Sequence, residues 1–85
     1  MTQPPPLSPR IQRANADYTL ETIFEYVRVN HGRIDSNTHR CLLVDAEGAF
    51  GTLCRLDRST ITRENAAKKF LKMCINISKK QSKTV

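Results

Sequence analysis

Residues 40–72, RCLLVDAEGAFGTLCRLDRSTITRENAAKKFLK, decide the fold that the sequence predicts. Apolar residues are dense at 41–44 and again at 50–56, which is typical of short strands. The segment 45–48 between them reads Asp-Ala-Glu-Gly and has the composition of a tight turn, with a glycine available for positive φ. We therefore expect two antiparallel strands joined as a hairpin.

A basic amphipathic helix is expected to follow the hairpin. Thr62 is a suitable N-cap, and Glu64 then lies in the first turn, where negative charge suits the helix dipole. Lys68, Lys69 and Lys72 lie on the polar side of this helix. Its inward side is formed by Ala66, Ala67, Phe70, Leu71, Cys74 and Ile75.

An earlier helix is predicted over residues 20–30. Leu20, Ile23, Phe24 and Val27 fall on one helical stripe, Thr19 is the expected N-cap, and Gly32 lies where the helix should stop. With a short edge strand at 33–34, the order becomes α-β-β-β-α. The predicted fold class is α+β, with two helices packed on one face of a small antiparallel sheet. The predicted domain limits are a Pro-rich flexible linker at 1–17, the folded domain at 18–78 and a basic tail at 79–85.

Composition limits the classes of function. The 85 residues allow one domain, and the net charge of +6 favours an acidic partner. The three cysteines include no C-x-x-C pair, no secretory signal precedes them, and no apolar run is long enough to cross a membrane. We therefore expect a cytoplasmic protein, with the nucleus as the alternative, and no membrane partner.

The residue types that support catalysis or metal binding are scattered. His39, Cys41, Cys54 and Cys74 are the candidate zinc ligands, but they lack the paired spacing of zinc knuckles, so buried thiols are the favoured interpretation. The eight acidic residues form no cluster suited to hydrolysis, and nothing places His31 or His39 beside a nucleophile. We predict a protein that is not an enzyme and has no cofactor and no metal.

Taken in order, several short motifs resemble the double-stranded-RNA-binding domain. Phe24-Glu25-Tyr26 followed by Gly32 is similar to that family's first-helix motif, and His39 stands where the family has a Gly-Pro-x-His loop. The run Asn65-Ala66-Ala67-Lys68-Lys69-Phe70-Leu71 is similar to its second helix. However, residues 60–64, Thr-Ile-Thr-Arg-Glu, replace the Lys-Lys-x-Ala-Lys run with which the family clamps phosphates.

These departures resemble the degenerate copies of the domain that bind proteins, above all the third, C-terminal domain of Dicer-partner proteins in RNA silencing. The resemblance implies a non-catalytic protein-interaction domain that mediates homodimerisation, docking to a Dicer-type ribonuclease, or both. Double-stranded RNA would then be bound weakly or through other domains of the parent protein.

The last predicted strand, residues 50–56, is the expected interface. It is apolar and only lightly protected by charge, and an unpaired edge strand invites pairing with another chain. The alternative is that its own helices cover it. The predicted dimer or partner interface comprises Phe50, Thr52, Leu53, Cys54, Arg55 and Leu56.

Two further interpretations stay open. One is a working duplex-RNA binder that uses the basic second helix. Its predicted contacts are Glu25, His39, Arg63, Lys68, Lys69 and Lys72. The other is a small DNA-binding regulatory module whose hairpin enters a groove through Arg40, Arg55 and Arg58.

Overall fold

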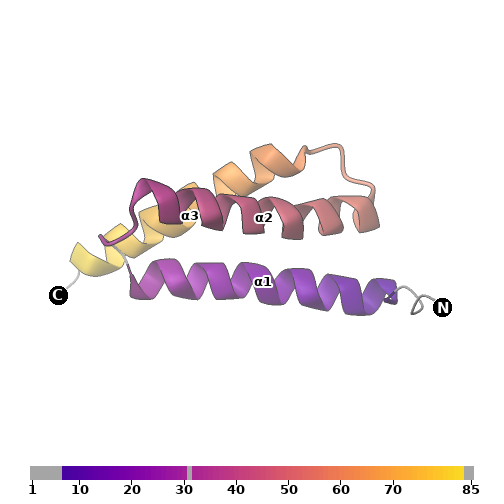
Figure 1. Cartoon of the computed structure of the whole chain (residues 1–85), viewed down its shortest axis with the longest axis horizontal. Helices are drawn as coiled ribbons and strands as arrows, with labels where there is room; N and C mark the ends of the chain where they lie inside the picture. The colour runs from indigo at the N-terminus through magenta and orange to yellow at the C-terminus, as the bar shows by residue number, and fades with distance from the viewer. Residues whose placement is uncertain (1–6, 31, 84–85) are drawn as a thin grey trace.

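The computed structural model describes the backbone of residues 7–30 and 32–83, with side chains described as far as Lys80. It is a bundle of three helices (Figure 1): α1 at Pro9–Val29, α2 at Ser36–Asp57 and α3 at Arg63–Lys83. The first two helices lie antiparallel and side by side, and α3 crosses this pair obliquely. Every regular element of the described residues is a helix, so the predicted α+β fold is wrong.

The predicted hairpin is the single helix α2. Among its buried and half-buried apolar residues, Leu42, Ala46, Ala49 and Leu53 are separated by four, three and four positions, which places them on one side of a helix. Asp35 caps the N-terminus, with a carboxylate oxygen accepting from the Thr38 N–H at 2.7 Å. Tertiary packing of this apolar side outweighs the local strand character of 41–44 and 50–56 and the turn character of 45–48.

Helix α1 begins much earlier than predicted. Ser8 is its N-cap, with a side-chain oxygen accepting from the Ile11 N–H at 3.3 Å, and Pro9 occupies the first turn, where its missing N–H costs nothing. The linker prediction is therefore wrong for residues 9–17, while residues 1–6 lie outside the described part. Thr19 is no cap, since its hydroxyl donates to the Asn15 carbonyl within the helix. The predicted stop is confirmed: the helix ends before Gly32, which has φ +79°.

Helix α3 begins as predicted and ends later. The Thr62 hydroxyl oxygen accepts from the Asn65 N–H at 3.4 Å, and Glu64 lies in the first turn. The helix then continues to Lys83, so the prediction of a separate tail is wrong for residues 79–83. Residues 84–85 lie outside the described part.

The core lies where the three helices meet. Its buried members are Ile23, Val27, Ala46, Ala67, Leu71 and Cys74. Ala46 and Ala67 have no exposed surface, and these small side chains let the helices approach closely. Phe50 of α2 and Phe70 of α3 meet edge to face, with ring centroids 5.6 Å apart. The predicted inward faces of the two terminal helices are thus confirmed.

Candidate docking groove

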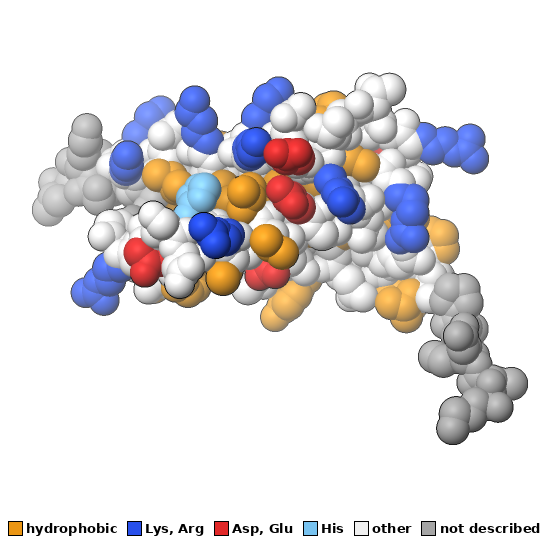
Figure 2. Space-filling model, turned by 45° about the horizontal axis from the view of Figure 1, so that its top comes forward, with side chains coloured by type: hydrophobic (Ala, Val, Ile, Leu, Met, Phe, Trp, Pro, Cys, Tyr) orange, Lys and Arg blue, Asp and Glu red, His pale blue; other side chains and the backbone are white. Residues whose placement is uncertain are grey.

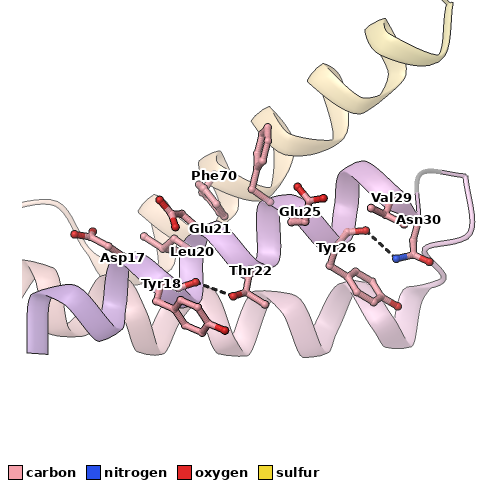
Figure 3. A pocket seen from close by; sticks show the side chains of 11 residues that line it. Asp17, Tyr18, Leu20, Glu21, Thr22, Glu25, Tyr26, Val29, Asn30 and Phe70 are labelled. Atoms are coloured by element: carbon pink, nitrogen blue, oxygen red, sulfur yellow. Dashed lines mark hydrogen bonds between the residues drawn. The ribbon is translucent and has the colours of Figure 1, made fainter.

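An open groove runs along α1 and reaches α3 (Figure 3). Its volume is about 1080 Å³. Among the described residues, Phe70 is the lining residue of α3, and the remainder come from residues 17–29 of α1 and its C-cap. The lining comprises Asp17, Tyr18, Leu20, Glu21, Thr22, Phe24, Glu25, Tyr26, Val29, Asn30 and Phe70. We call this surface the α1 groove.

Helix α1 is apolar on two sides. One side is buried in the core through Ile23 and Val27. The other carries Tyr18, Tyr26 and Val29, which are 71%, 43% and 62% exposed. Positions 18, 26 and 29 are eight and three residues apart, so they share one face of the helix. A surface helix needs only one apolar stripe to pack into its own core, so the outward stripe is available to another molecule.

The charged residues of the α1 groove are all acidic. Asp17, Glu21 and Glu25 are spaced by four residues and form one row along α1. Glu25 accepts two hydrogen bonds from Arg28, one at 3.1 Å from Nε, and this bonding lowers the pKa of the carboxyl. Among the described residues Glu21 forms no ion pair. The groove is therefore an apolar and acidic surface on a chain with a net charge of +6.

The predicted strand interface does not exist as an edge. Phe50 packs against Phe70, the Cys54 thiol donates to the Ile61 carbonyl at 3.3 Å, and Arg55 donates to the Gln12 side chain at 2.5 Å. Thr52 donates to the Gly48 carbonyl inside α2. Leu53 and Leu56 are half-buried. Most of this segment is occupied by contacts within the bundle, which corrects its prediction as an unpaired edge strand.

The residues predicted to contact RNA are dispersed over the bundle. Glu25 is engaged by Arg28 on α1. His39 lies in the first turn of α2 and lines a small cavity with Lys79, near the end of α3. Arg63 lies at the other end of α3, against Gly51. The three lysines, Lys68, Lys69 and Lys72, are exposed on α3. Of the predicted set, only these lysines share a surface.

The residues of the predicted DNA-binding hairpin are likewise helical. Arg40 is exposed in the first turns of α2, and Arg58 closes the same helix in the left-handed conformation at φ 52°. Arg55 is held by Gln12. With no hairpin among the described residues, the proposed insertion of strands into a groove loses its structural basis.

The four candidate zinc ligands do not converge. Cys41 is exposed, and the Cys54 thiol donates a hydrogen bond to the Ile61 carbonyl in the α2–α3 loop. Cys74 is buried in the core, and this burial raises the pKa of its thiol. Within residues 7–30 and 32–83, no three His, Cys, Asp or Glu side chains are grouped to hold a metal ion. None of the described helices is long and apolar enough to span a membrane.

The fold and the groove define the class of protein: a small all-helical bundle with an open amphipathic groove along its first helix. Comparison with protein-family models, with curated proteins and with solved structures found no match. Any assignment of function therefore depends on the groove itself. Tyr18, Glu21 and Val29 were not among the predicted site residues, although the acidic series Asp17, Glu21, Glu25 is visible in the sequence.

Proposed function

We propose that this chain is a non-catalytic protein-interaction module whose α1 groove binds a basic amphipathic helix of another protein. The observation that carries the proposal is the composition of the groove. Among the described residues, its lining combines exposed and half-buried apolar side chains with acidic ones and contains no lysine or arginine. A ligand that complements it must present apolar anchors beside positive charges.

The dimensions of the groove favour a helical ligand. From Asp17 to Val29 the helix rises by about 18 Å, which matches roughly three turns of a bound helix. A helix that docks in this way uses anchors at i, i+3, i+4 and i+7, and Phe24 and Phe70 provide the apolar floor against which they would pack. Glu21 supplies charge between this floor and the exposed Tyr18, where basic residues of the ligand would lie.

Charge argues against a second copy of the chain as the occupant. In a symmetric dimer the same patch faces itself, so the acidic rows formed by Asp17, Glu21 and Glu25 would meet in one interface. Like charges brought together in this way oppose association. We therefore assign the groove to a different protein rather than to the homodimer expected from the sequence.

The role in RNA silencing and the Dicer-type partner stay predictions that depend on the family resemblance alone. The proposed interaction function needs neither. It moves the interface from residues 50–56 to the outer side of α1.

Titration with a defined peptide tests the proposal. The probe is a helix of about 20 residues with a leucine stripe flanked by lysines, and a scrambled peptide of the same composition lacks the stripe. We expect the ordered peptide to bind and Glu21→Lys to weaken it about tenfold, which corresponds to about 1.4 kcal/mol. The introduced lysine would lie four residues from both Asp17 and Glu25, so the variant should fold.

Asp45→Lys provides the matched control. It makes the same change of charge at an exposed position of α2 outside the groove and should leave peptide affinity unchanged. Equal affinity for the ordered and scrambled peptides, or equal weakening by both variants, would show that the groove is not a specific helix-binding site.

A further inference from the structure

The net charge of the chain is confined to its last helix. Residues 1–62 contain seven basic and seven acidic residues, whereas residues 63–85 contain seven basic and one acidic. The whole charge of +6 therefore belongs to α3 and the two residues after it. If the surface charges served only solubility, positive and negative side chains would be mixed over all three helices. The concentration of positive charge on α3 therefore requires another explanation.

The lysines of α3 form a ridge on its outer side. Positions 65, 69, 72, 76 and 79 are separated by alternating intervals of four and three residues, so they follow one line along the helix. Their side chains, Asn65, Lys69, Lys72, Asn76 and Lys79, are all exposed. Lys68 and Lys80 flank this line and are exposed too. We call these seven residues the α3 ridge.

No acidic residue of α3 interrupts the α3 ridge. The single acidic residue of this helix is Glu64, which accepts from Lys68 at 3.0 Å and lies before the line begins. In Figure 2, several lysine and arginine side chains lie along the upper margin of the molecule, while others lie beside the acidic side chains near the middle of that face. The ridge from Lys68 to Lys80 is about 18 Å long on one continuous helix.

We propose that the α3 ridge binds the phosphate backbone of a double-stranded nucleic acid without reading its sequence. Lysine ammonium groups and asparagine amides are donors to phosphate oxygens, and a row of fixed cations matches a linear polyanion. The ridge contains no aromatic side chain for base stacking, which disfavours single strands. Met73, 48% exposed, is the single exposed large apolar side chain beside it on the described part of α3, less than the apolar face with which a helix inserts into a lipid surface.

This inference is independent of the α1 groove. The ridge lies on the outer side of α3, and the groove lies along α1, with Phe70 as the contribution of the described part of α3. The two surfaces share no residue, so variants of one should leave the function of the other intact.

The test measures binding of the full chain to labelled duplexes of about 16 base pairs, in separate DNA and RNA arms, by fluorescence anisotropy. If four phosphates are neutralised, log K on B-DNA changes with log salt at a slope of about −3.6, and affinity falls about 150-fold between about 50 and about 200 mM salt. Removing two of these contacts with Lys69→Gln and Lys72→Gln should reduce that fall to about 12-fold.

A matched variant separates the ridge from net charge. Arg10→Gln with Arg33→Gln removes the same two charges from exposed positions outside α3 and should keep the steep salt dependence. Lysine and glutamine have similar helix propensities, and unchanged circular dichroism will show that the lysine variant folds. Binding to either duplex type with these results supports the proposal.

Four outcomes would overturn it: no duplex binding at about 50 mM salt, a shallow salt dependence, equal losses in the two double variants, or a preference for single strands. Binding to vesicles rich in phosphatidylserine in the absence of duplex binding would assign the ridge to a lipid surface instead.

Discussion

Arg13, in the second turn of α1, forms a two-bond ion pair with Asp57, the last residue of α2. One of these bonds joins Nη1 to a carboxylate oxygen at 3.2 Å. Beside it, Arg55 donates to the Gln12 side chain. Two contacts between residues more than 40 positions apart thus fasten the start of α1 to the end of α2. They hold in place the helix turns that the sequence pattern assigned to a linker.

The Arg13–Asp57 pair should make stability depend on pH. The hydrogen bonds from Arg13 lower the pKa of the Asp57 carboxyl. Because the pKa of Asp57 is lower in the folded state, the ion pair stabilises the protein fully at pH values above the ordinary aspartate pKa, near 4. This stabilisation is lost as the pH falls through the folded-state pKa. We expect Asp57→Asn to reduce the free energy of unfolding at about pH 7 and not at about pH 2. The reduction should be modest, because both partners of the ion pair are half exposed.

Urea unfolding at the two pH values measures this difference. Asp45→Asn removes an exposed carboxylate of α2 that forms no ion pair among the described residues and serves as the control. An equal effect of Asp57→Asn at both pH values would exclude the ion pair as its cause.

Gly48 distinguishes the helix from the hairpin. A Cβ at Gly48 would meet no atom within 4 Å. In the middle of a helix, Gly48→Ala should raise the free energy of unfolding by about 1 kcal/mol, or the melting temperature by about 4–8 °C for a domain of this size. At the glycine position of a tight turn with positive φ, the same change would destabilise the protein.

Gly51→Ala should give a smaller gain. Its new methyl group would lie 3.4 Å from the Arg63 Cδ, at the lower limit of ordinary contact, although the flexible arginine side chain can shift. Thermal melts of the two variants side by side provide the comparison, and a lower melting temperature for Gly48→Ala would contradict the helical assignment of α2.

Leu71 should be among the most sensitive positions of the core. It is 1% exposed and packs where α3 meets the other two helices. Leu71→Ala should cost about 2–5 kcal/mol, through lost burial and the cavity left behind. Val44, on α2, is 60% exposed, so Val44→Ala should stay within about 0.5 kcal/mol. Chemical denaturation gives both values, and similar losses in the two variants would show that the core is placed incorrectly.

Cys41 and Cys74 should react with a thiol reagent at different rates, which their surroundings set. Cys41 is exposed and should be labelled at once by a thiol reagent under native conditions. Cys74 is 2% exposed, and burial raises the pKa of its thiol, so little reactive thiolate forms. We expect its labelling only on unfolding, as measured by mass spectrometry after a timed reaction. Equal labelling rates for Cys41 and Cys74 would contradict the packing of α3.

The two terminal helices could be predicted because their apolar periodicity is unambiguous. Ile23 and Val27, and likewise Ala67 and Leu71, repeat at a spacing of four residues, and the Thr62 cap marks where the last helix begins. The start of α1 could not be predicted, because the prolines of the N-terminal segment are typical of a linker. In the structure, Pro9 occupies the first turn of the helix, a position that tolerates proline.

The middle helix could not be predicted from local signals. Four successive apolar residues at 41–44 have strand character, and two glycines at 48 and 51 lower helix propensity. Both signals are overridden by the packing of Ala46 and Ala49 against the neighbouring helices. The site follows the same pattern: Asp17, Glu21 and Glu25 are readable at four-residue spacing, but the exposure of Tyr18 and Val29 becomes apparent only in the folded bundle.

Chemical-shift mapping with the leucine–lysine helical peptide tests the central claim, that the outer side of α1 binds a basic amphipathic helix. We predict that the largest backbone amide shifts fall at Tyr18, Glu21, Tyr26 and Val29, with Phe70 the main responder of α3. Shifts concentrated on α2, or spread evenly over all three helices, would contradict this claim.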